Sequence, residues 1–259
     1  MRRRSSARVG FSLVEILVTI AIIAVLIAIA LPVLGAARAR ARAAKSLVNT
    51  RTIAQQFEMY TSQHETYPHT WRGAMPPASF DDVGYEVPWY PPGWVSASSH
   101  YWDLSLRWPG LVEASEEWPA HIETWVSPGR ERVLPEPPTG TSHEIESFVS
   151  YEYAHGFLGD PSLWTSRGVS EWRLARGIRP AEVSFPSGKV MIWDRHLGWA
   201  KPPEKREGHL DAQTPMAFTD GHADTLNPLD AAEGVANPLN DGAARRLHNT
   251  PDGVRGRDY

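Results

Sequence analysis

The sequence predicts an α+β fold in which one long N-terminal helix packs on a small antiparallel β-sheet, with long loops rich in proline and tryptophan. Three observations support this fold class. An apolar run at 11–31 continues into residues with helical spacing, the stretch 69–144 is broken by prolines, and the C-terminal half contains short alternating segments typical of strands. We expect a helix of about 50 residues, roughly 75 Å long at 1.5 Å per residue.

The apolar run is long enough to cross a bilayer. Phe11 to Leu31 is 21 residues with a single charge, Glu15, and as a helix it spans about 31 Å. Four arginines and no acid precede it in residues 1–10, which predicts a cytoplasmic N-terminus. Because a carboxylate in an apolar helix is unfavourable unless it is paired, Glu15 is a candidate functional residue.

Two ordinary alternatives apply to this segment. A secretory signal peptide has an apolar region of about 7–15 residues that ends at a small-residue cleavage site. Here the run is longer, and Ala36-Ala37 lies just beyond it. A plain single-pass anchor fits the length, but it explains neither Glu15 nor the Gly10-Phe11 junction.

The six residues Gly10-Phe11-Ser12-Leu13-Val14-Glu15 resemble the N-terminus of type IV prepilins and type II secretion pseudopilins. In these families a short basic leader ends in Gly, and Phe-(Ser/Thr)-Leu-(Ile/Val)-Glu and an apolar helix follow it. This chain matches at every one of these positions. The resemblance implies a pilin-like version of the α+β fold.

The resemblance also assigns roles to single residues. A prepilin peptidase would cleave between Gly10 and Phe11, and the new amino group of Phe11 would be N-methylated. Glu15 would be the assembly residue that attracts the N-terminal ammonium of a neighbouring subunit, a pairing that low dielectric strengthens. Pro32 would mark a helix kink or local melting, because proline removes one helical hydrogen bond and crowds the preceding turn.

Function and location follow from the same resemblance. It implies a pseudopilin-type structural subunit of a type II secretion or type IV pilus-like filament, without enzyme activity, cofactor or metal. The chain would be a single-pass protein of the bacterial inner membrane, with a cytoplasmic N-terminus and a periplasmic head. Its expected partners are prepilin peptidase, other pilin or pseudopilin subunits, the inner-membrane assembly platform and membrane lipid.

Composition limits the remaining possibilities. The formal charge is −4, and removal of the four leader arginines makes it −8, which argues against nucleic acid as a partner. There is no cysteine, so a disulfide framework is excluded. The 11 Trp, 8 Tyr and 7 Phe supply large aromatic area for a core. A carbohydrate-stacking surface is the alternative use of the tryptophans.

We divide the chain into a leader (1–10), a transmembrane part of the helix (11–34), an extramembrane part (35–66), a globular head (67–226) and a loose C-terminal tail (227–259). An apolar stripe predicts that the outer helix packs on the head: Leu47, Ile53, Ala54, Phe57 and Tyr60. Pro68 disfavours helix at Tyr67. The basic residues at 38–45 form a solvated or lipid-headgroup face.

Within the head we expect irregular loops and short helices over 69–144. A short helix enters at Leu104, and a strand over 123–126 ends in a turn. Further strands are expected at 147–153, 190–194, 214–219 and 222–226, the last two joined by a tight Asp220-Gly221 hairpin. Residues 227–259 are polar and rich in Gly, Asp and Asn, which predicts the loose tail.

The C-terminal half also resembles a large bacterial subfamily of pseudopilin-like proteins. That subfamily has a Ser-Tyr strand, a Pro-Ser-x-Lys/Thr turn before a strand ending in Asp, and a His followed by Asp-Gly. The matching elements are Ser150-Tyr151, Pro186 to Lys189, Asp194, His209 and Asp220-Gly221. Ten residues separate His209 from Asp220 where nine are usual, and the usual Cys is absent near Val126.

An enzyme is the alternative from a different class. The chain offers the ligand types of a hydrolytic metal site: Asp194, His196, His209, Asp220, His222 and Asp224. It lacks the HExxH, GxSxG and phosphate-loop motifs. We therefore favour a plain hairpin with polar neighbours, and Ca²⁺ on Asp220 and Asp224 is an intermediate possibility. The runner-up function is a membrane-anchored extracytoplasmic metal-dependent hydrolase or carbohydrate-binding protein.

Overall fold

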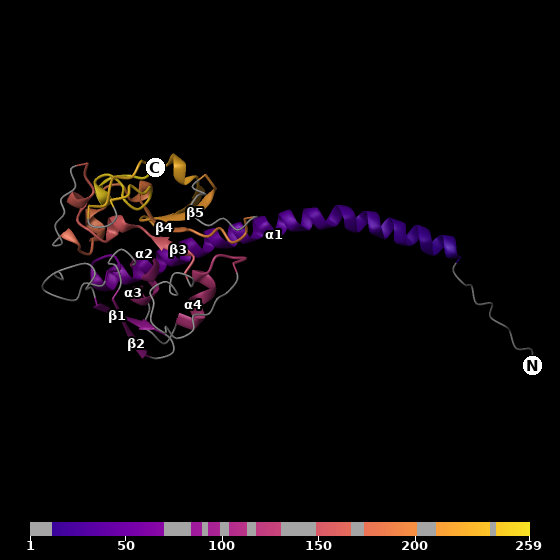
Figure 1. The fold of residues 1–259 in the computed structure, drawn as a ribbon, viewed down its shortest axis with the longest axis horizontal. Coiled ribbons are helices and arrows are strands. Elements are labelled where there is room, and N and C mark those ends of the chain that lie inside the picture. The colour runs from indigo at the N-terminus through magenta and orange to yellow at the C-terminus, as the bar shows by residue number, and fades with distance from the viewer. Residues whose placement is uncertain are drawn as a thin grey trace, which may run out of the picture. The chain divides into compact units, whose positions relative to one another are not determined.

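The computed structural model describes residues 12–69, 84–89, 93–98, 104–112, 118–130, 149–166, 174–200, 211–238 and 242–259. The chain divides into two units, Met1–Ala41 and Arg42–Tyr259, and each is described by itself. The first contains the start of one long helix, and the second contains the end of that helix and the whole sheet (Figure 1). The layout is α+β, as the sequence predicts.

Helix α1 runs without interruption from Leu13 to His64, a length of 52 residues, or about 78 Å. The prediction of one long N-terminal helix is confirmed. Pro32 lies inside α1 and helix is assigned on both sides of it, so the expected local melting is not seen. Pro32 donates no hydrogen bond to the preceding turn, and a kink there stays a prediction.

The outer part of α1 buries one face. Ile53, Ala54 and Phe57 have no solvent exposure, which confirms the centre of the predicted stripe. Leu47 and Tyr60, at its ends, are half-buried. The same face also buries three polar residues that the hydrophobic pattern passes over: Ser46, Asn49 and Thr50.

A four-stranded antiparallel sheet forms the centre of the head, in the order β3-β4-β5-β6. Its strands are β3 Tyr151–Tyr153, β4 Val190–Asp194, β5 Thr214–Phe218 and β6 Ala223–Leu226. The predicted hairpin is confirmed: β5 and β6 pair with Ala217 opposite Ala223, and Gly221 in the turn has φ +84°, which favours glycine.

The proline- and tryptophan-rich region contains more regular structure than expected. Its described parts hold an antiparallel pair, β1 Gly84–Trp89 and β2 Gly93–Ser98, and three short helices, α2 Leu104–Arg107, α3 Pro109–Val112 and α4 Trp118–Trp125. The helix entering at Leu104 is confirmed. The strand expected over 123–126 is wrong, because α4 extends to Trp125. Proline in the first turn of a helix removes no helical hydrogen bond, so Pro119 is compatible with α4.

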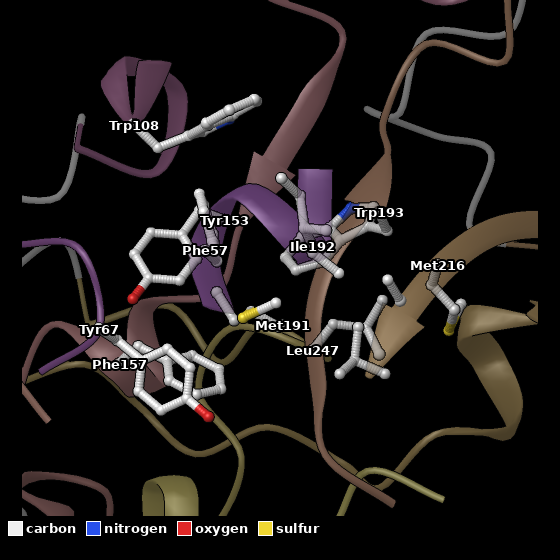
Figure 2. Packing of buried hydrophobic residues seen from close by; sticks show 14 of the residues in the cluster. Phe57, Tyr67, Trp108, Tyr153, Phe157, Met191, Ile192, Trp193, Met216 and Leu247 are labelled. Carbon is white, nitrogen blue, oxygen red and sulfur yellow. The ribbon is translucent and has the colours of Figure 1, made fainter. Parts of the chain in front are cut away.

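The core joins α1, the short helices and the sheet through aromatic rings (Figure 2). Phe57 lies edge-on to Tyr153, with ring centroids 4.9 Å apart, and to Trp108 at 5.3 Å. The Trp108 indole N–H donates to the Tyr151 carbonyl at 2.9 Å. Four of the tryptophans have at most 1 % exposure and therefore form core rather than a stacking surface: Trp108, Trp125, Trp164 and Trp193.

The prediction of a loose tail over 227–259 is wrong for the residues that the structure describes there. Leu247 and Val254 are buried in the core cluster. The backbone N–H of Asp252 donates to the Trp164 carbonyl at 2.7 Å, and that of Asp258 donates to the Gly188 carbonyl at 2.7 Å. This segment packs on the head with few apolar residues, because Leu247 and Val254 are both buried and the backbone N–H groups of Asp252 and Asp258 are hydrogen-bonded.

The lowered pKa values of two partly buried histidines, His69 and His196, lead us to expect that stability depends on pH. Burial, with Arg176 nearby, lowers the pKa of His69 to about 4, and burial beside Arg130 and Arg195 lowers the pKa of His196 to about 3. Below pH 6.5 the unfolded chain therefore binds protons that the folded chain does not. The free energy of unfolding should fall between pH 6 and 4, by up to about 1.4 kcal/mol per pH unit for each histidine.

Urea unfolding of the detergent-solubilised chain at several pH values measures this effect. His69→Asn and His196→Asn remove the titrating groups, so each should make the dependence shallower. A free energy of unfolding that stays level or rises as the pH falls through this interval contradicts the prediction.

Candidate functional site

The N-terminal part of α1 is apolar and exposed on all sides. Every large apolar side chain from Leu13 to Leu34 is between 47 and 80 % exposed. Among the described residues, α1 is the one helix long and apolar enough to cross a membrane, and none of its most apolar window is buried. Such a surface needs lipid or other protein around it.

Glu15 lies in the first turn of α1, where it forms a reciprocal cap with Ser12. The Ser12 backbone N–H donates to Glu15 Oε2 at 2.8 Å, and the Glu15 N–H donates to Ser12 Oγ at 3.2 Å. This is a capping box, which satisfies N–H groups that the start of a helix leaves without partners. Within the described part of the chain, Glu15 Oε1 accepts no hydrogen bond.

The role of Ser12 was not predicted, although the sequence contains a signal for it. The pattern Ser-x-x-Glu ahead of an apolar run is the sequence signature of a capping box. Glu15 therefore has a structural role in the single chain, and this role uses one of its two carboxylate oxygens.

Of the remaining predicted site residues of this segment, the structure describes Pro32. Gly10 and Phe11, the predicted cleavage and methylation residues, lie outside the described residues. Pro32 lies 17 positions beyond Glu15 in α1, which separates them by about 25 Å along the axis.

A second polar site lies where the outer part of α1 meets the sheet, and we call it the helix anchor: Ser46, Asn49, Tyr151 and Asp194. Ser46 Oγ donates to Asp194 Oδ2 at 2.6 Å. Because that bond uses the only hydroxyl hydrogen of Ser46, the Tyr151 hydroxyl donates to Ser46 Oγ at 3.1 Å. Asn49 Nδ2 donates in turn to the Tyr151 oxygen at 3.1 Å. The four groups form one directed chain of hydrogen bonds that ends on the carboxylate.

Asp194 is the final acceptor of the helix anchor and has 1 % exposure. Its Oδ1 accepts the backbone N–H groups of His196 and Leu197, each at 2.9 Å. Burial raises the pKa of Asp194, while these hydrogen bonds act in the opposite direction. Burial also raises the pKa of Tyr151 well above 10, with the nearby Asp194 carboxyl adding to it. Tyr151 is therefore a neutral hydroxyl donor.

The structure explains part of the C-terminal sequence motif. Tyr151 on β3 and Asp194 at the end of β4 face each other in the sheet register, and both hold α1 through Ser46. The sequence did not indicate Ser46 and Asn49, because polar residues on a helix normally count toward its solvent face. The buried positions of α1 are 46, 49, 50, 53, 54 and 57, so Ser46 and Asn49 continue the helical spacing of the apolar stripe. That spacing is the sequence signal for their burial.

The described members of the proposed metal-ligand set do not gather in one place. Asp194 is occupied by the helix anchor. Asp220 and His222 contact each other in the β5–β6 turn at 2.5 Å, while Asp224 is exposed on β6. His209 lies outside the described residues. Among the residues that the structure describes, no group of three or more His, Asp or Glu side chains is arranged to hold a metal ion.

No protein-family model, curated protein or solved structure matches this chain.

Taken by its chemistry, the site has two functional parts. The exposed apolar helix can enter a bilayer or a bundle of helices, and its first turn carries one carboxylate able to pair with a cation there. The helix anchor fixes the outer part of α1 to the head through buried hydrogen bonds.

Proposed function

We propose that this chain is a pseudopilin-type structural subunit of a type II secretion or type IV pilus-like filament. In this proposal α1 holds the subunit in the inner membrane before assembly and forms the filament spine after it. The head is periplasmic and is held on the spine by the helix anchor.

The observation that carries the proposal is the position of Glu15. A membrane anchor needs only apolar residues, and a carboxylate on its exposed surface is unfavourable. Glu15 lies in the first helical turn, four residues after Phe11 of the Gly10-Phe11 junction. Cleavage at that junction would create the cation that a neighbouring subunit could place against Glu15 Oε1.

The exposure of α1 supports the same assembly. All large apolar side chains of its first 22 residues are open to contact, so neighbouring subunits can pack their helices together. A single ammonium–carboxylate pair at a fixed depth then sets the axial register between them, because an unpaired charge at low dielectric is penalised. Lipid covers the same surface before assembly.

A bulky residue in place of Gly10 tests the processing step. Gly10→Trp should leave the leader attached, because the peptidase requires a small residue before the cleavage site. The unprocessed chain should still enter the membrane, since insertion depends on the apolar run. N-terminal mass analysis and membrane fractionation measure both properties.

Ala7→Trp is the matched control, because it adds the same bulk to the leader away from the junction. We expect it to be processed normally. Removal of the leader from Gly10→Trp at the same position and rate as from the wild type contradicts the proposed processing.

A further inference from the structure

Lys189, Thr250 and Asp258 form a sealed cluster at the start of β4. Lys189 and Asp258 have fully buried side chains, and Lys189 Nζ lies 3.2 Å from Asp258 Oδ2 and 3.4 Å from Oδ1. The Thr250 hydroxyl contacts both groups: it is 2.5 Å from Lys189 Nζ and donates to Asp258 Oδ1. The Val190 backbone N–H donates to the other oxygen, Oδ2, at 2.8 Å.

The environment of this cluster disfavours the charged form of the Lys189 amine. Both members of the pair are removed from water, which is unfavourable for an ammonium and a carboxylate alike. Burial lowers the pKa of Lys189, with the nearby Asp258 acting in the opposite direction. Transfer of one proton from Nζ to the carboxylate, with Thr250 as the bridge, leaves an uncharged amine beside a carboxylic acid.

We propose that Lys189 and Asp258 join through an intramolecular amide bond. The Lys189 amine attacks the Asp258 side-chain carbonyl carbon, and the C–N bond forms. The C–Oδ1 bond breaks, and Oδ1 leaves as water with the acid proton and one amine proton. No oxidant or reductant is required.

The neighbours of the pair have defined roles in this reaction. Negative charge develops on Oδ2 during the attack, and the Val190 N–H already donates to that atom, as an oxyanion-stabilising group must. Thr250 contacts the attacking nitrogen and the leaving oxygen, so its hydroxyl can relay the proton between them. These are positioning and proton-transfer roles in a single-turnover reaction within the folded chain.

The backbone supplies the proximity that amide formation needs. The N–H groups of Asp258 and Tyr259 both donate to the Gly188 carbonyl, at 2.7 and 3.2 Å. This places the two side chains opposite each other before any reaction, which is the main requirement of an intramolecular condensation. The bond would fasten residues next to the C-terminus to the buried strand β4.

Tryptic digestion of the purified full-length chain tests the proposal. Trypsin cleaves after unmodified lysine and arginine, so an amide at Lys189 should prevent cleavage there. We expect a branched peptide that consists of residues 177–195 with Asp258-Tyr259 attached to Lys189, one water lighter than the sum of its parts. Tandem mass spectrometry locates the branch.

Two variants sharpen the test. Asp258→Asn should give the identical branched product with loss of ammonia in place of water, because an amide can be attacked at the same carbon. Lys189→Met lacks the nucleophile and should give only linear peptides. In the wild type, a linear peptide ending at Lys189, together with labelling of Lys189 by an amine reagent after denaturation, shows an ion pair only and overturns the proposal.

Discussion

The Glu15→Leu variant is expected to insert in the membrane and lose its leader like the wild type, and to be absent from filaments. Leucine removes a penalised charge, so insertion should not weaken. The ammonium at Phe11 of the adjacent subunit would then lack its partner at low dielectric, and the defect would recur at every subunit. Membrane fractionation beside a filament or secretion assay measures the two outcomes separately.

Glu15→Gln separates assembly from helix capping. Glutamine keeps the hydrogen bond of a capping box to Ser12 and removes the charge. If the charge pairs with a neighbour, Glu15→Gln should fail in assembly like Glu15→Leu. Normal filaments from Glu15→Gln, with failure of Glu15→Leu, would assign Glu15 to capping alone, and normal filaments from both would leave a simple anchor.

Asp194→Ala is expected to lower the free energy of unfolding by about 3–5 kcal/mol, because it removes the final acceptor of the helix anchor. Ser46 Oγ and the backbone N–H groups of His196 and Leu197 all donate to this carboxyl group. Without it, these buried donors have no acceptor. Urea unfolding of the detergent-solubilised chain, followed by tryptophan fluorescence, measures the loss.

Asp224→Ala is the matched control for the helix anchor. Asp224 is an exposed aspartate on β6 that, within the described part of the chain, accepts the N–H of its neighbour Thr225. Its removal should therefore change the free energy of unfolding by less than about 0.5 kcal/mol. An equal effect of the two substitutions, or a loss below about 1 kcal/mol for Asp194→Ala, would show that the anchor does not hold α1 to the head.

Local sequence signals predicted the elements that depend on local chemistry. The apolar run and the stripe through Ile53 and Phe57 predicted α1, because a helix of 3.6 residues per turn repeats its buried face. Asp220-Gly221 predicted the β5–β6 hairpin, because a glycine accepts the positive φ of the turn. These features need no knowledge of what lies across the core.

The helix anchor could not be predicted in the same way. Ser46 and Asp194 are 148 positions apart in the sequence, and nothing in either local segment indicates the other. The same holds for Lys189 and Asp258, whose partnership exists only because residues near the C-terminus return to β4. Composition made 227–259 look loose, whereas the structure uses its polar side chains as buried hydrogen-bond partners.

The helix α4 shows a different limit. Residues 123–126 read Glu-Thr-Trp-Val, and their β-branched and aromatic side chains favour strands. The structure nevertheless has a helix here, which begins at Trp118 and continues through Trp125. The Trp125 indole N–H donates to Gln56 of α1 at 3.2 Å, so a tertiary contact accompanies the helical conformation of this segment.

The N-terminus of the wild-type chain extracted from membranes tests the central claim most directly. Intact-mass and N-terminal analysis should show a chain that begins at Phe11 and carries a methyl group on its amino nitrogen. A chain that begins at Met1, or after a signal-peptidase site near Ala37, would contradict the assignment to a pilin-type filament.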